Sequence, residues 1–134
     1  MRKAELVVRM ILGMTRRNID SLVIAIEVVI DLLFCQKVPR QHIRVTKDVY
    51  PEVTKRIRKE GDPLITVGSV TKRIERLSNL CWDKIVENGW EEKYTGTRLN
   101  DINAPSDMIF ILAYYTHYGI PYYLDMKNEL AMII

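Results

Sequence analysis

Apolar residues recur at intervals of three and four along most of the chain, the spacing that gathers them on one face of an α-helix. No segment alternates apolar and polar residues between hairpin dipeptides, as strands do. The pattern therefore predicts an all-α fold of six helices. We expect them at about residues 3–12, from Asn18 or Asp20 to residue 35, in a short stretch after Pro39, at residues 49–60, from Thr66 or Ser69 to residue 88, and at residues 107–118.

The second of these helices is apolar around almost its whole circumference, which is typical of a helix surrounded by others. It is shorter than the roughly 20 residues that a bilayer requires, and it carries Glu27 and Asp31, so we interpret it as the core helix and expect no membrane partner. Residues 89–104 are polar and turn-rich. Residues 119–134, called here the C-terminal tail, form an additional apolar segment.

Length and composition favour a single globular domain, because 134 residues with 48% apolar side chains suffice for one core. A multidomain enzyme, a disordered tail and a membrane protein are disfavoured. Cys35 and Cys81 lie in apolar runs without CxxC spacing, so we expect two reduced, buried thiols in a cytoplasmic protein and no zinc site.

Candidate catalytic residues are few, so we expect a protein that is not an enzyme and needs no cofactor or metal. Neither His42 nor His117 sits within a helical turn of a cysteine or a carboxylate pair that would complete a triad or a metal cluster. Glu27 and Asp31 share one helix face, which we interpret as a polar edge of the core helix. The single, scattered glycines form no phosphate-binding loop.

The fifth helix presents two different faces. At about 100° per residue, a core-facing stripe is predicted for Val67, Val70, Ile74, Leu77, Cys81 and Ile85. The outer face carries short hydroxyls, basic groups and an amide, which are the side chains that read base edges in the major groove. The base-reading candidates are Ser69, Thr71, Lys72, Glu75 and Arg76.

Formal charge is concentrated next to this face. It is +3 over residues 1–52, +4 over residues 53–76 and −4 over residues 77–134, in a chain of net +3. A local basic patch of this kind suits the phosphates of double-stranded DNA, although a solvated helix surface gives the same pattern. The phosphate-contacting candidates are Lys55, Arg56, Arg58, Lys59, Thr66, Arg73 and Asn79.

Several segments resemble one known family over about residues 6–118. The segments are LGMTRRNIDSLVIAIEVVI, VTKDVYPEVTKRI, GSVTKRIERLSNLCW and APSDMIFILA, and they are similar in order to the C-terminal effector domain of stage zero sporulation protein A. The resemblance implies a bacterial, cytoplasmic transcription regulator with a six-helix bundle-like fold that contains a helix-turn-helix. It also implies VYPEVTKRI as the positioning helix, the helix at about residues 68–88 as the recognition helix, and RNA polymerase as a candidate partner.

The sequence departs from that family in three places. Between Pro51 and Val70 it is about six residues longer than the family pattern, which enlarges the turn at residues 58–65. Glu75 stands where the family has a basic residue, so we expect a different base preference. The receiver domain that precedes the effector domain in the family is not part of these residues.

Two alternatives remain open at this point. Five of the seven tyrosines fall within residues 114–123, which suits either inward packing or an interface, so the alternative to a DNA-binding regulator is a protein-interaction module that has lost DNA readout. The C-terminal tail either folds back on its own core or packs on a second copy, because large apolar patches are rarely left in water. We expect a homodimer through this region.

Overall fold

A computed structural model describes residues 2–96 and 105–119, which contain six α-helices and no strand. This confirms the all-α fold. The helices are α1 (Lys3–Leu12), α2 (Asp20–Ile30), α3 (Tyr50–Glu60), α4 (Val67–Glu87), α5 (Glu91–Thr95) and α6 (Pro105–Tyr118), with π-helical turns at Asp31–Cys35 and Val45–Val49 and a 3-10 turn at Arg40–His42.

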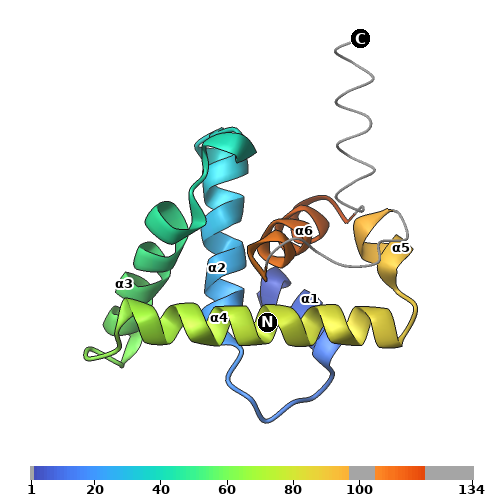
Figure 1. Ribbon diagram of the computed structural model, residues 1–134. Helices are drawn as coiled ribbons and strands as arrows, with labels where there is room; N and C mark the ends of the chain where they lie inside the picture. The colour runs from blue at the N-terminus through green and yellow to red at the C-terminus, as the bar shows by residue number, and fades with distance from the viewer. Residues whose placement is uncertain (1, 97–104, 120–134) are drawn as a thin grey trace.

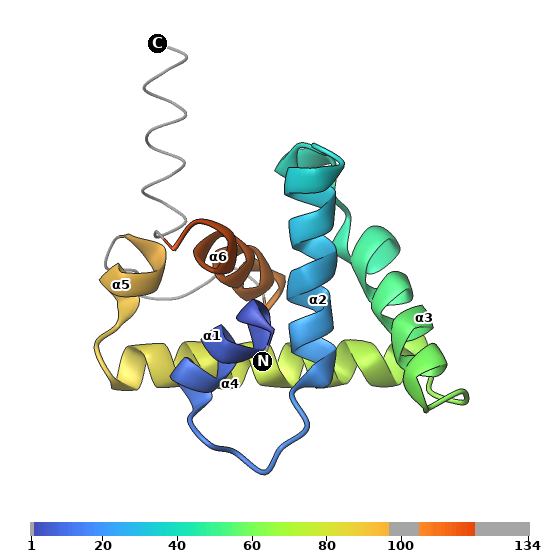
Figure 2. The same ribbon diagram turned by 180° about the vertical axis from the view of Figure 1, so that it is seen from behind.

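Helix α2 is the centre of the fold. It packs against α1, α3, α4 and α6, and its Leu22, Val23, Ala25 and Ile26 are completely buried. Figures 1 and 2 show α3 on one side of α2 and α1 and α6 on the other. The all-round apolar pattern of α2 therefore corresponds to burial inside the bundle. No helix in the described ranges is long and apolar enough to cross a membrane.

Helix α4 is the longest of these helices, with 21 residues, and it lies across the base of the bundle (Figure 1). Its predicted core stripe is buried at Val70, Ile74, Leu77, Cys81 and Ile85. The prediction is wrong for Val67, which is 38% exposed. Val67 is the first residue of α4, and the helix begins there beyond the edge of the core.

The second predicted helix is α-helical only as far as Ile30. It continues as the π-helical turn, in which the Gln36 amide donates to the Asp31 carbonyl at 2.8 Å. The wider turn changes the register of the apolar stripe. Cys35 is consequently exposed, which corrects the expectation that both thiols are buried; Cys81 is buried as predicted.

Residues 91–95 form α5 within the stretch that the sequence indicated to be turn-rich, so that expectation is wrong there. Two buried side chains, Tyr94 and Thr95, anchor this short helix. Tyr94 is completely buried, with its ring centroid 4.6 Å from that of Tyr115 and 6.3 Å from that of Trp90. Residues 97–104 and 120–134 lie outside the described residues.

The two cysteines should differ sharply in reactivity. Burial raises the pKa of the Cys81 thiol to about 12, and alkylation requires the thiolate. We expect iodoacetamide at pH 8 to modify Cys35 in the folded chain and to leave Cys81 unmodified. Mass spectrometry of tryptic peptides should show one modified cysteine in buffer and two in urea. Equal labelling of both in buffer would contradict this packing.

Candidate nucleic-acid interface

Helices α3 and α4 are joined by residues 61–66 and pack directly against each other. Figure 1 shows α3 inclined steeply to α4 and meeting it at the end where α4 begins. The connection is longer than the three or four residues usual in a helix-turn-helix. Because α3 continues to Glu60, the enlarged turn is residues 61–66 and not residues 58–65 as the sequence indicated.

Contacts at both ends close this turn. The chain leaves α3 at Gly61, whose φ of 137° suits glycine, and the Gly61 amide donates to the Ile57 carbonyl. Arg58 Nε donates to the Ile65 carbonyl at 2.9 Å. The Ile65 side chain is only 6% exposed and anchors the turn in the core. The turn is thus held at both ends despite its length.

Thr66 begins α4 as its N-cap. Its backbone is extended, and its Oγ1 accepts a hydrogen bond from the Ser69 amide at 3.1 Å. An N-cap of this type satisfies one of the four amides that a helix start leaves unpaired. Thr66, predicted as a phosphate contact, therefore already has a structural role. It fixes the start of the predicted recognition helix.

Lys72, Arg76 and Asn79 are exposed on the outer face of α4, at intervals of four and three residues. At about 100° per residue they lie on one stripe opposite the buried one. None of their side chains has a hydrogen bond or an ion pair within residues 2–96 and 105–119. The structure thus brings two base-reading candidates and one phosphate candidate together on a single open surface.

The other three base-reading candidates lie toward the flanks of α4. Ser69, Thr71 and Glu75 are each half-buried. Glu75 lies near Tyr50 of α3. The pKa of the Tyr50 hydroxyl is raised to about 12, mainly by burial and to a smaller extent by the negative charge of Glu75. Glu75 is therefore directed toward α3, where it is less available to a base edge than Lys72 or Arg76.

Helix α3 presents its phosphate candidates in two ways. Lys55 and Lys59 are exposed and lie one helical turn apart, opposite the buried Val53. Arg56 is paired with Glu52, with Nε 3.3 Å from the carboxylate oxygen, and Arg58 closes the turn. Of these four side chains, only the two lysines have neither an ion pair nor a hydrogen bond within the described ranges, whereas Arg58 keeps its charge but is held by the Ile65 carbonyl.

Arg73 has acidic surroundings. It lines a hollow of about 260 Å³ together with Asp20 of α2 and Glu60 and Asp62 at the end of α3. Arg73 is exposed and forms no ion pair with these carboxylates in the described part of the chain. Acidic neighbours around the same hollow make this a less favourable place for a phosphate than the stripe of Lys72 and Arg76.

Sequence reasoning missed two arginines in the loop between α1 and α2. Arg16 and Arg17 are exposed, and the next residue, Asn18, lines the same hollow as Arg73. The loop therefore approaches α4 from the side. The signal in the sequence was an adjacent basic pair in a loop that follows Gly13, but residues 1–52 spread their charge too evenly for it to stand out.

The candidate catalytic residues do not come together. His117 stacks on Phe34 with ring centroids 3.9 Å apart, and His42 lies in the 3-10 turn. Glu27 pairs with Arg2, and Asp31 accepts from Gln36. Across the described part of the chain, no group of three or more histidine, cysteine, aspartate or glutamate side chains is arranged to hold a metal ion.

No protein-family model, curated protein sequence or solved structure matches the chain significantly. The resemblance to the sporulation effector domain therefore stays a prediction. The function has to follow from the surface that α3, α4 and their connecting turn present.

The N-cap of α4 is open to a direct test. We expect Thr66→Ala to lower the free energy of unfolding by about 1 kcal/mol, because the Ser69 amide loses its acceptor. Thr66→Ser keeps the acceptor oxygen and should cost less than half as much. Urea denaturation followed by circular dichroism measures both. If the two substitutions cost the same, the hydroxyl does not cap α4 in solution.

Proposed function

We propose that the protein is a sequence-specific DNA-binding transcriptional regulator, with the first half of α4 placed in the major groove and α3 positioned on the phosphates. The observation that carries the proposal is the open stripe of Lys72, Arg76 and Asn79 on a capped helix whose opposite face is core. Lysine and arginine read guanine edges, and asparagine reads adenine. A rigid helix presents such groups in a fixed register.

Shape supports this placement of α4. The helix begins beyond the core, where Val67 is 38% exposed and Gly68 is also exposed, and Leu64 of the preceding turn is 89% exposed. The first turns of α4 therefore stand clear of the rest of the bundle. In helix-turn-helix proteins the residues near the start of the recognition helix contact the bases.

Charge supports the same orientation. Lys72 and Arg76 lie in the first half of α4, whereas Asp83 and Glu87 are exposed in its second half. Phosphates attract the first half and repel the second. Lys55 and Lys59 on α3, with Arg16 and Arg17 on the loop, extend the positive surface on the elements that pack beside the start of α4.

Lys72 and Arg76 should read bases. After the preferred site has been selected from random duplex, we expect Lys72→Ala or Arg76→Ala to cost about 1–3 kcal/mol on that site and much less on random DNA. Fluorescence anisotropy on both duplexes measures the difference. Lys84→Ala is the matched control, because Lys84 is exposed on the far half of the same helix and pairs with Glu87 at 3.3 Å. Equal losses on both duplexes would mean that Lys72 and Arg76 contact only phosphates.

The two exposed lysines of α3 should contact phosphates. Replacing Lys55 and Lys59 together with alanine should weaken binding to all sequences about equally. It should also flatten the slope of log K against log salt by roughly 2 units, because each phosphate contact contributes about 0.9. Titrations between 50 and 200 mM salt test this. An unchanged slope would place the DNA on another surface.

The alternative is a protein-interaction module that has lost DNA readout, for which the tyrosine group was the sequence signal. In the structure Tyr114 is buried, Tyr115 is half-buried and Tyr118 is 48% exposed; Tyr122 and Tyr123 lie outside the described residues. Inward packing therefore accounts for much of the group. Absence of binding to any duplex at 50 mM salt would favour the alternative.

A further inference from the structure

The hollow of about 260 Å³ beside Arg73 lies where the start of α2 and the end of α3 meet α4, and we call it the acidic hollow. Both α2 and α3 pack against α4 there (Figure 1). Its polar lining consists mainly of Asp20 and Ser21 of α2, Glu60 of α3, Asp62 of the following turn and Arg73 of α4. Three helices thus contribute polar side chains to one small cavity.

The hydroxyl of Ser21 is buried in the wall of this hollow without a partner. Ser21 is only 4% exposed, and its Oγ forms no hydrogen bond within the described part of the chain. Buried polar atoms are almost always paired, because an unpaired one loses its hydrogen bonds to water and gains none. Ser21 also lies in the first turn of α2, where unpaired amides favour an anion. A ligand oxygen in the hollow would satisfy this hydroxyl.

The charged side chains around the hollow have no partners either. Asp20, Glu60, Asp62 and Arg73 are exposed, and none of their side chains forms an ion pair or a hydrogen bond within residues 2–96 and 105–119. Three carboxylates and one guanidinium give them a formal charge of −2. The three carboxylates are not arranged so that they could together hold a metal ion. The hollow therefore offers acceptors for ammonium groups and one guanidinium for a carboxylate.

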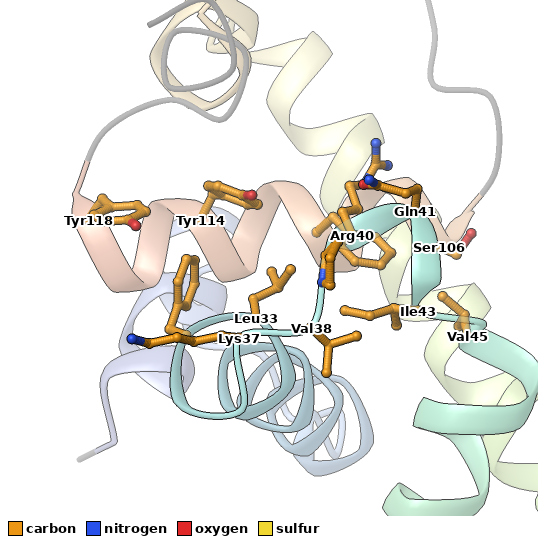
Figure 3. A pocket seen from close by; sticks show the side chains of 13 residues that line it. Leu33, Lys37, Val38, Arg40, Gln41, Ile43, Val45, Ser106, Tyr114 and Tyr118 are labelled. Carbon is orange, nitrogen blue, oxygen red and sulfur yellow. The ribbon is translucent and has the colours of Figure 1, made fainter. Parts of the chain in front are cut away.

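A larger hollow of about 760 Å³, between α6 and the segment that follows α2, differs in this respect (Figure 3). Its Arg40 guanidinium pairs with Asp107 at 3.3 Å and lies 4.6 Å from the centroid of the Phe110 ring. Among the described residues, none that lines this larger hollow has a buried side-chain nitrogen or oxygen without a hydrogen-bond partner. Unpaired polar groups therefore favour the acidic hollow as a ligand site, although it is the smaller of the two.

We propose that the acidic hollow binds a basic amino acid, with the ligand carboxylate on Arg73 and the Ser21 hydroxyl and the two ammonium groups among the three carboxylates. Guanidinium groups bind carboxylates through two parallel N–H donors, and ammonium donors pair with carboxylate oxygens. Drug-sized ligands occupy pockets of about 300–1,000 Å³, so this hollow has the size for an amino acid. A basic amino acid carries one more positive than negative group, which opposes the charge of the hollow. This inference goes beyond the proposed function and does not rest on it.

Equilibrium dialysis of the full chain tests the site with three probes. Radiolabelled L-lysine carries all three charged groups, whereas cadaverine lacks the carboxylate and ε-aminocaproate lacks the α-ammonium group. We expect one L-lysine to bind per chain and each of the other two to compete with an affinity about tenfold lower, because each loses one charged hydrogen-bond pair. Absence of bound L-lysine at a free concentration of about 1 mM would overturn the proposal. Equal affinity for L-lysine and either of the other probes would overturn the assignment of the charged groups.

An arginine substitution with a matched control locates the binding. Arg73→Ala should weaken binding of L-lysine about tenfold and should not weaken binding of cadaverine, because only the amino acid has a carboxylate for the guanidinium. Arg44→Ala should change neither affinity, since Arg44 is also exposed but does not line the hollow. Equal weakening of L-lysine binding by the two substitutions would overturn the location in the hollow.

A substitution of Ser21 separates a ligand contact from a structural role. Because the Ser21 hydroxyl has no partner in the described chain, Ser21→Ala should leave the melting temperature without ligand unchanged or higher. The rise in melting temperature at a fixed L-lysine concentration should become smaller, because the ligand carboxylate loses a donor and binds less tightly. Circular dichroism measures both quantities without DNA. A lower melting temperature without ligand, or an unchanged rise with L-lysine, would overturn this contact.

Discussion

The burial of α2 on all sides is the constraint on which the rest of the structure depends. An apolar helix of this kind is stable in water only when neighbours cover its whole circumference, and each fully buried Leu, Ile or Val contributes about 1.5–3 kcal/mol. Helices α1, α3, α4 and α6 provide the cover. Because α3 and α4 both pack on α2, their relative orientation is set by the core as well as by the turn between them. The candidate interface is therefore the solvent-facing side of two helices, α3 and α4, whose other sides pack in the core.

Periodicity predicted those parts of the fold in which one face of a helix is buried. The buried positions of α4 from Val70 to Ile85 follow from spacing alone, since core contact and helical repeat agree there, and the end of α1 follows from Gly13 after the last apolar position. The predicted burial of Val67 and Cys35 was wrong for a different reason. Each lies where a helix begins or changes its hydrogen-bonding pattern, and periodicity carries no information about where the surrounding core stops. Helix α5 depends on the contact of Tyr94 with Tyr115, which are distant in sequence.

The candidate site shows a second limit of sequence reasoning. A polar side chain on an outer face can bind a partner or can complete local structure, and the residue type does not distinguish the two. Arg58 and Thr66 both fit a basic, hydroxyl-bearing DNA surface, yet they hold the turn and the start of α4. Arg73 fits the same pattern, but the fold places it beside Asp20, Glu60 and Asp62. Lys72 and Arg76 are still candidates for base contacts, because nothing in the described part of the chain covers them.

The candidate interface shares its support with the rest of the bundle. Helix α4 packs against α2 and α6, and α2 packs against α6, so the core that orients α4 includes a helix, α6, that contributes no candidate DNA contact. A substitution that loosens the packing of α6 would therefore act on the proposed DNA affinity through the fraction of folded chain. A substitution on the outer face of α4 would act on the proposed base preference and leave that core unchanged.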